Sequence, residues 1–341
     1  MSTNAKTMNT HEYEVKLFKS AERSMRYDGS MPFAEWQKMA REKLTELLGL
    51  PLVPGECRVD MEYEREREDS VEYRFTVETE PGYAVPCHLL IPRGVSGRIP
   101  LTLCLSGHGG GMHVALGVAK CEGDEQALES WPHRNMSRRS LDEGRAALVI
   151  ENRSFGECSL EGYGTSCQEA AKIAILNGRT VLGERVWDCM RIIDAVTEHF
   201  SEIDTEGIVA TGNSGGGTLT YYLACIDERI TYAAPSCSVC TFEESIAAKR
   251  HCMCNYVPSI RRYFEMGDFG GLIAPRYIVV AAGEADPGFY IKGSRDAYAE
   301  IERLYAAAGV PERCALEVDP GGHLNYADRI WPHINEWKAA K

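Results

Sequence analysis

The segment ATGNSGGG at residues 210–217 limits the possible folds of this chain more than any other. A short β-branched run precedes it and an apolar helical run follows it, so it predicts a strand, a sharp turn and a helix. Gly212 and Gly216 flank Ser214, and their missing side chains allow a tight turn with the Ser214 hydroxyl at its apex. The N–H of Gly215 begins the new helix and can donate to an oxyanion formed at the serine. The simpler alternative is a glycine-rich turn before an ordinary helix.

Short apolar runs and helical patterns alternate along much of the chain. The runs are nearly continuous, as expected for strands covered on both faces. The alternation predicts an α/β fold with a mostly parallel, doubly wound sheet of about eight strands. The expected core strands lie at 101–105, 146–150, 207–211, 232–234, 277–282 and 314–319, the clearest helices at 33–48 and 186–200, and antiparallel edge strands at 58–67, 71–78 and 84–91.

A serine nucleophile needs a base, and the base needs a carboxylate to orient it. Ligands gather at the carboxyl ends of parallel strands, so both partners are expected on loops that follow strands. Asp286 lies in the turn after the run at 277–282, and His323 follows two glycines after the run at 314–319. Serine, acid and histidine then occur in the order that this strand–turn–helix arrangement requires. The sequence therefore predicts a triad of Ser214, Asp286 and His323.

Other carboxylates compete for the role of the acid. Glu284 is the rival two residues before Asp286, and Asp319 lies close to His323 in the sequence. Asp286 also has a structural alternative, because an aspartate before Pro287 can simply start a turn. We favour Asp286 because its loop is the expected one.

A glycine-rich loop with the sequence SGHGGGM follows the first core strand, at residues 106–112. Its three consecutive glycines allow the backbone to approach a substrate oxygen closely. An oxyanion hole of this kind takes one N–H from the residue after the nucleophile and one from such a loop. The predicted donors are Gly215 and one of His108, Gly109 and Gly110, with the His108 side chain shaping the turn. The alternative is a flexible surface loop.

Several motifs combine into a recognisable pattern: GHGGG at 107–111, RSFGE at 153–157, GERVWD at 183–188, GNSGG at 212–216, Asp286, and GGH at 321–323. Together they resemble the α/β-hydrolase superfamily, and within it the acetyl xylan esterase and cephalosporin C deacetylase-like branch related to dienelactone hydrolases. The resemblance covers the chain from about Phe33 to the C-terminus. It implies hydrolysis of carboxylic esters by a serine, often of small acyl groups on a sugar or similar alcohol. Such esterases commonly have glutamine after the serine, where this chain has Gly215.

The chain is long enough for one large domain with additions. We expect residues 1–30 to form an N-terminal extension, because they show little periodicity, and residues 31–341 to form a single α/β-hydrolase domain. Residues 237–274 are predicted to form an insertion over the active site, with aromatic side chains such as Phe242 and Tyr256 as pocket walls. A plain helical connection between two strands is the alternative.

Charge and targeting signals exclude some partners. The 37 Lys and Arg against 50 Asp and Glu give a net charge of −13, so we expect no nucleic acid and no anionic membrane surface as partner. The first residues lack the apolar core of a signal peptide, and no apolar stretch is long enough to span a bilayer. The 13 cysteines then indicate free thiols in a reducing compartment. The expected location is the cytoplasm.

Two cysteine pairs raise the question of a metal. Cys237 and Cys240 form one pair, and Cys252 and Cys254 form another beside His251, which together offer thiolates and an imidazole to zinc. However, the first pair follows an expected core strand, where thiols pack well, and the spacing of the second is not a usual ligand spacing. We therefore expect no metal and no cofactor.

The candidate substrate contacts are Asn213, Glu157 and Phe289, each next to a predicted catalytic residue or just past a strand end. Glu157 has an alternative role as the ion-pair partner of Arg153. The expected partner is a small-molecule ester. The edge strands and the insertion also leave a homo-oligomer open, with no subunit number implied.

Two other functions stay open. An amidase or oligopeptidase would use the same triad, although the chain has neither a large gating domain nor a clear charged specificity feature. A catalytically silent ligand-binding protein on the same fold would have no need of the complete set of serine, acid and histidine.

Overall fold

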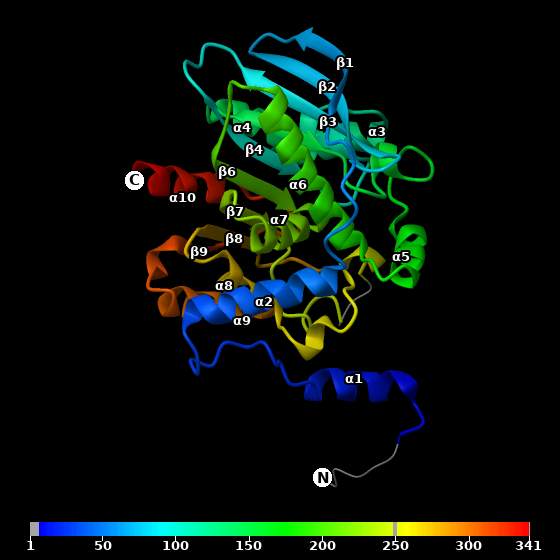
Figure 1. Cartoon of the computed structure of the whole chain (residues 1–341), viewed down its shortest axis with the longest axis vertical. Helices are drawn as coiled ribbons and strands as arrows, with labels where there is room; N and C mark the ends of the chain where they lie inside the picture. The colour runs from blue at the N-terminus through cyan, green and yellow to red at the C-terminus, as the bar shows by residue number, and fades with distance from the viewer. Residues whose placement is uncertain (1–6, 248–250, 341) are drawn as a thin grey trace.

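Nine strands form one mixed sheet in the part of the chain that this computed structural model describes, residues 7–247 and 251–340 (Figure 1). Their order is β1-β2-β3-β5-β4-β6-β7-β8-β9. The strands from β5 to β9 in this order run parallel, whereas β1, β2 and β3 form an antiparallel extension that joins β5. The strands are β1 (Val59–Glu66), β2 (Ser70–Glu80), β3 (Tyr83–Pro92), β4 (Ile99–Leu105), β5 (Ala146–Ile150), β6 (Ile203–Asn213), β7 (Ile230–Ser236), β8 (Tyr277–Gly283) and β9 (Cys314–Asp319). The predicted α/β fold class is confirmed.

Helices cover both faces of this sheet. The core on one face includes residues of α2, α6, α7, α8 and α9, and Figure 1 shows α2, α6 and α7 in front of the strands. On the other face, α4 packs near β5 and α10 packs over β8 and β9. The helices are α1 (Thr10–Ser20), α2 (Phe33–Leu48), α3 (Glu122–Ser130), α4 (Met136–Asp142), α5 (Cys167–Leu176), α6 (Val181–His199), α7 (Gly215–Ile226), α8 (Gly270–Ile273), α9 (Ile291–Ala307) and α10 (Ala327–Ala339).

Strand β8 shows why the core strands were predictable. Ile278 and Val280 belong to the core on the α2 and α9 side, whereas Val279 and Ala281 belong to the core under α10. Because side chains alternate across a strand, a strand covered on both faces needs apolar residues at every position. The continuous apolar run in the sequence follows directly from this double coverage.

The N-terminal residues contain a helix that the sequence did not predict. Helix α1 has no fully buried residue, although Val15 and Phe18 are half-buried and Phe18 packs against the core. Asn9 caps it by accepting a hydrogen bond from the N–H of Glu12. Figure 1 shows α1 apart from the sheet, and the ion pair of Lys19 with Glu243 (2.7 Å) links it to the chain after β7. The division into an extension at 1–30 and one domain stays a prediction.

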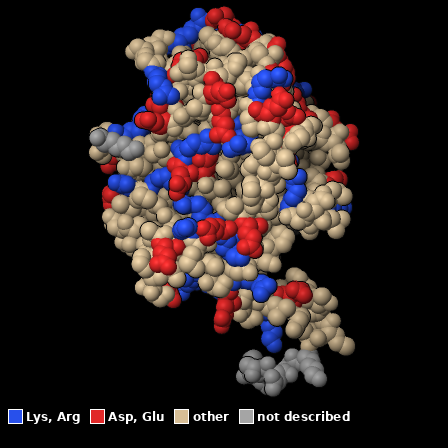
Figure 2. All heavy atoms as spheres, viewed as in Figure 1, with Lys and Arg blue, Asp and Glu red and all other residues tan. Residues whose placement is uncertain are grey.

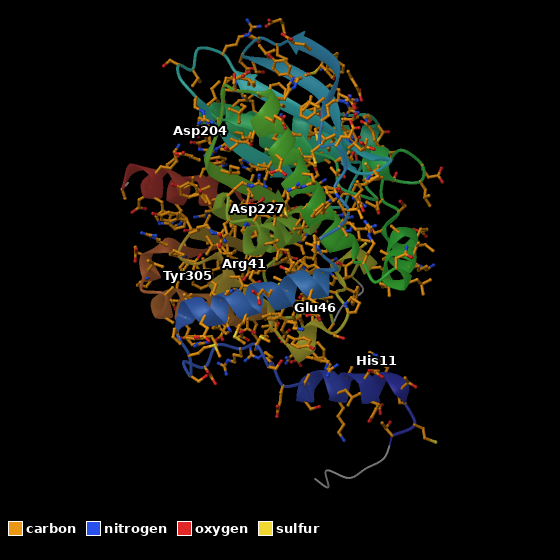
Figure 3. The ribbon with its side chains drawn as sticks, in the orientation of Figure 1. His11, Arg41, Glu46, Asp204, Asp227 and Tyr305 are labelled. Carbon is orange, nitrogen blue, oxygen red and sulfur yellow. The ribbon has the colours of Figure 1, made fainter. Side chains whose placement is uncertain are left out.

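Helix α2 occupies the residues that its periodicity predicts, and it fixes the position of α7. The Nε group of Arg41 donates to the carbonyl of Cys225 near the C-terminal end of α7 (2.9 Å), where a cation is favourable (Figure 3). Another Arg41 nitrogen donates to the carbonyl of Leu272 in α8 (2.9 Å). One side chain therefore joins three helices.

The chain between β7 and β8 forms only short helices in its described residues, 237–247 and 251–276. They are the 3-10 helices η4 (Met253–Asn255), η5 (Ile260–Arg262) and η6 (Met266–Phe269), followed by α8. Helices this short have little stability of their own, so contacts with the rest of the protein must hold this segment in place.

The surface mixes charges of both signs. Figure 2 shows clusters of Lys and Arg beside clusters of Asp and Glu on the visible face, with uncharged areas between them. Among the described residues, no helix is both long and apolar enough to cross a membrane.

Candidate active site

Ser214 lies at the turn between β6 and α7, with backbone angles that few residues other than glycine adopt. Its φ and ψ are 56° and −120°, and its N–H donates to the carbonyl of Ser236 (3.0 Å). A Cβ on Gly216 would lie 1.9 Å from the carbonyl oxygen of Leu105, and one on Gly212 would lie 2.4 Å from the carbonyl carbon of Gly216. Neither glycine has room for a side chain. A strained serine in such a turn is typical of a functional position.

The parallel strands bring the predicted residues to one edge of the sheet. His108 follows β4, Ser214 follows β6, Asp286 follows β8 and His323 follows β9. All four strands run in the same direction, so their carboxyl ends meet at this edge, where ligands bind in open α/β sheets.

The loop that carries His323 is fastened to the serine turn. The carbonyl of Leu324 accepts from the Asn213 side-chain amide and from the Ser236 hydroxyl, both at 2.8 Å. These two hydrogen bonds hold the histidine loop beside Ser214. Asn213, a predicted substrate contact, therefore has a positioning contact within the protein.

Asp286 is the carboxylate that the structure places against His323. Its Oδ2 accepts from Nδ1 of His323 (2.8 Å), and its Oδ1 accepts from the N–H groups of Gly288 (2.8 Å) and Phe289 (3.1 Å). Burial raises the pKa of Asp286, but the hydrogen bond and charge of His323, with the two N–H groups, outweigh burial and leave the pKa lowered. The carboxylate is therefore ionised and fixed in orientation.

The rival carboxylates have other partners. Glu284 lies 3.8 Å from Arg295 with 58% of its side chain exposed. Asp319 accepts from the N–H of Gly321 (2.9 Å) and pairs with Arg329 (3.2 Å). Among the described residues, Asp286 alone of the three contacts the His323 ring.

The His323 ring contacts Asp286 and Phe289, and part of it is exposed to solvent. Besides its bond to Asp286, it stacks on Phe289 with ring centroids 5.9 Å apart and planes at 10°. Within the described chain no hydrogen bond joins the ring to the Ser214 hydroxyl. Such a contact is often long in a free enzyme and shortens when substrate binds. A third of the histidine side chain (33%) is exposed, which leaves it accessible.

The glycine loop after β4 passes against the serine turn. A Cβ on Gly107 would lie 3.2 Å from the Cβ of Ser214. In the described part of the chain, the N–H groups of Gly215, Gly109 and Gly110 have no protein acceptor. Unpaired N–H groups at a helix start and in an adjacent loop are suited to stabilise a developing oxyanion.

The His108 ring itself faces the serine turn. A Cβ on Gly215 would lie 2.8 Å from Nδ1 of His108, and the centroid of the ring lies 4.7 Å from that of Phe155. A glutamine after the serine would therefore need His108 to move. The ring position accounts for the glycine that distinguishes this turn from the resembling esterases.

Glu151 shapes the glycine loop and was missed in the sequence. Its carboxylate accepts from the N–H of Met112 (3.0 and 3.2 Å) and from the N–H of Glu157 (3.2 Å). Burial raises the pKa of Glu151 to about 7, although these N–H groups act in the opposite direction. A signal was present in the sequence, because Glu151 is the charged residue directly after the apolar run of β5.

The alternative ion pair between Glu157 and Arg153 was wrong. Glu157 pairs with Arg74 of β2 (2.6 Å) and lies 3.7 Å from Lys120. Arg153 pairs instead with the buried Asp188 of α6 (2.6 Å). The turn between the two residues directs Arg153 into the protein and Glu157 towards β2. There Glu157 lines a cavity of about 370 Å³.

The two cysteine pairs considered for zinc do not form one group. Cys237 lies near the Asp286–His323 pair, and burial raises the pKa of its thiol to about 12. Cys252 and Cys254 lie instead with His108 and Cys167, which come from other parts of the chain.

The sheet order, the strained turn at Ser214 and the loops beyond β4, β8 and β9 together define an α/β-hydrolase fold. The profile of the Abhydrolase family (Abhydrolase_7) matches residues 18–316. The chain belongs to this family of α/β hydrolases.

Known proteins with similar sequence or structure agree with this class. The chain is 24% identical to "Putative hydrolase YtaP" of Bacillus subtilis (strain 168). The 295 aligned residues cover 84% of this chain and 94% of that protein. It superposes on "a putative acetyl xylan esterase" from Bacteroides fragilis NCTC 9343 with a TM-score of 0.85 and 16% identity, covering 99% and 97% of the two chains. A glucuronoyl esterase from Solibacter usitatus gives a TM-score of 0.70 at 14% identity, covering 94% and 99%. These structures share the fold of this chain.

Proposed function

We propose that this chain is a serine carboxylic-ester hydrolase that acts through an acyl-enzyme on small, acetyl-like esters of a sugar or similar alcohol. The observation that carries the proposal is the Asp286–His323 hydrogen bond of 2.8 Å, together with the fastening of the His323 loop to the strained turn of Ser214. A carboxylate, an imidazole and a serine are the parts that acyl transfer needs, and here they follow the chain order serine, acid, histidine.

In the proposed reaction, Nε2 of His323 takes the proton of the Ser214 hydroxyl as the oxygen attacks the ester carbonyl. Asp286 keeps the proton of His323 on Nδ1, which leaves Nε2 free to act as the base. The N–H of Gly215 and one N–H from His108, Gly109 or Gly110 accommodate the oxyanion. His323 next protonates the leaving alcohol and then activates a water molecule, which hydrolyses the acyl-serine bond and restores the enzyme.

Two observations support a small acyl group on a carbohydrate. A cavity of about 40 Å³ beside the glycine loop, lined in part by Gly109, Met136 and Asn213, suits a small group better than a long chain. Of the two solved neighbours described above, the one named "a putative acetyl xylan esterase" carries a name that denotes a small acyl group on a carbohydrate.

The test is the hydrolysis of p-nitrophenyl acetate, butyrate and octanoate by wild type and by Ser214→Ala, with Ser201→Ala as a control for the same change at an exposed serine. We expect acetate to be preferred, Ser214→Ala to lose turnover and the control to retain it. A fluorophosphonate probe should label wild type and not Ser214→Ala. If folded wild type hydrolyses none of the three esters and resists the probe, the esterase proposal is refuted in favour of a ligand-binding protein.

A further inference from the structure

Four side chains of metal-ligand type, from three distant parts of the chain, meet beside the glycine loop. They are His108 after β4, Cys167 at the first residue of α5, and Cys252 and Cys254 in the segment between β7 and β8. One donor atom from each lies within 4.8 Å of all the others. Nε2 of His108 is 3.4 Å from Sγ of Cys254 and 3.9 Å from Sγ of Cys167.

These separations fit the edges of a zinc tetrahedron. With Zn–S bonds of about 2.3 Å and a Zn–N bond of about 2.0–2.1 Å, tetrahedral angles place nitrogen and sulfur about 3.6 Å apart. The two measured distances from His108 lie on either side of this value. Three cysteines and one histidine are also a common donor set of structural zinc sites.

The guanidinium of Arg185 is a buried positive charge beside the four donors, and such a charge is normally balanced by a negative one. Arg185 is 2% exposed, and its Nη2 lies 3.3 Å from Sγ of Cys167. Its other contacts are the carbonyl of Arg153 (2.7 Å) and the ring face of Phe155 (4.3 Å). Among the described residues, no carboxylate lies within ion-pair distance of Arg185, although buried charges are normally paired.

We propose that His108, Cys167, Cys252 and Cys254 bind a structural zinc ion. Each thiol gives up its proton to solvent on binding, and the imidazole binds as the neutral ring through Nε2. Zinc with three thiolates has a net charge of −1, which balances Arg185. Neutral thiols packed together would leave that guanidinium without a counter-charge. Four protein ligands fill the tetrahedron, so the metal has a structural role.

The site joins three segments, two of which the proposed active site needs in fixed positions. His108 belongs to the glycine loop, and Cys252 and Cys254 belong to the segment of short helices that has little stability of its own. Next to Cys252, Nε2 of His251 lies 3.1 Å from the carbonyl of Gly288, and its ring packs on Phe289 with centroids 5.1 Å apart. The metal therefore holds this segment against the loop that orients the histidine base.

The sequence spacing could not indicate this donor set. Cys252 and Cys254 have one residue between them, and the other two ligands lie far away in the sequence. The fold supplies the grouping, because α5 and η4 pack beside each other next to the loop after β4.

The test is the metal content of the full chain, purified without chelators and measured by mass spectrometry of the elements. We expect one zinc ion per chain in wild type, a loss of most of it in Cys254→Ser and in Cys252→Ser, and no change in Cys121→Ser, which alters an exposed cysteine. Protein in which cobalt replaces zinc should show thiolate-to-cobalt charge transfer and the strong visible bands of a tetrahedral site. These readouts do not depend on ester hydrolysis, so they are distinct from the test of the esterase proposal.

Wild type alone can refute the proposal, even if the variants fail to fold. Folded protein that contains no zinc as purified, takes up none on incubation with zinc ions and gives no cobalt bands would overturn it. A disulfide between two of the three cysteines, found by peptide mapping of protein kept free of oxidants, would also overturn it. Removal of zinc by a chelator should lower the unfolding temperature of wild type and leave that of Cys254→Ser unchanged.

Discussion

Replacing Asp286 with asparagine tests the proposed catalytic site most directly. The carboxylate has two sides, one taken by the N–H groups of Gly288 and Phe289 and the other by Nδ1 of His323. In Asp286→Asn, the amide oxygen must accept from the two backbone N–H groups, so the amide NH₂ faces the histidine. Two donors cannot share one hydrogen bond, and His323 is driven to the tautomer with its proton on Nε2.

That tautomer cannot take the proton of Ser214, so the chemical step suffers most. We expect kcat to fall about 10⁴-fold, the loss known for this change in a serine protease triad, which corresponds to about 5.4 kcal/mol in the activation barrier. The unfolding free energy should fall much less, by roughly 1.5–3 kcal/mol for one hydrogen bond to a charged group.

The assay compares kcat for p-nitrophenyl acetate with thermal unfolding of the same preparations. Glu284→Gln is the matched control, because this rival acid lies two residues earlier, exposed, and beside Arg295 rather than His323. We expect the control to retain kcat within about twofold, as for a change at an exposed site. Loss of activity in Glu284→Gln together with an active, folded Asp286→Asn would refute the assignment of the acid.

Three further changes test the scaffold. In Gly216→Ala the new Cβ meets the carbonyl oxygen of Leu105 at 1.9 Å, so urea unfolding should show a loss of about 3 kcal/mol or more. Because the pKa of Glu151 is raised from 4.5 to about 7, its contribution to stability is present at low pH and is lost as pH rises through about 7. The test is chemical unfolding of wild type and Glu151→Gln between pH 4.5 and 7. The difference in unfolding free energy, wild type minus variant, should fall by about 3 kcal/mol across that range. Arg153→Met leaves the buried Asp188 unpaired and should cost roughly 3–5 kcal/mol in thermal unfolding, and a loss below 1 kcal/mol would contradict a buried pair.

The sequence predicted the sheet well because each core strand is marked in the sequence by its own short apolar run. The apolar runs became β4 to β9, with the expected bounds for β5 and β9 and slightly longer ones for the other four, and the alternating polar segments became β1 to β3. The sheet has nine strands where about eight were expected, and β1 in the antiparallel extension has one buried residue at its start and is otherwise exposed. Helix α1 was not predicted, and its apolar residues are at most half-buried.

The candidate site was predictable as far as its chemistry is encoded locally. Ser214, Asp286 and His323 each follow a strand, so the fold class alone brings their loops to one edge. Glu151 and the partners of Glu157 depend on how β2 and β5 lie beside the glycine loop, which the sequence order does not specify. The proposed zinc ligands are the extreme case, because their spacing gives no local pattern.

The position of His108 connects the turn of the serine with the cysteine group. A side chain at Gly215 would require the His108 ring to move, because the ring lies 2.8 Å from where a Cβ would be. The ring in turn lies within 3.4 Å of Cys254, in a segment that packs against Phe289 and through it against His323. The glycine after the serine and the cysteines far along the chain are therefore parts of one arrangement. If the cysteine group fixes the His108 ring, the segment between β7 and β8 holds the loop that supplies the proposed oxyanion donors. The ring then leaves no room for a side chain after the serine.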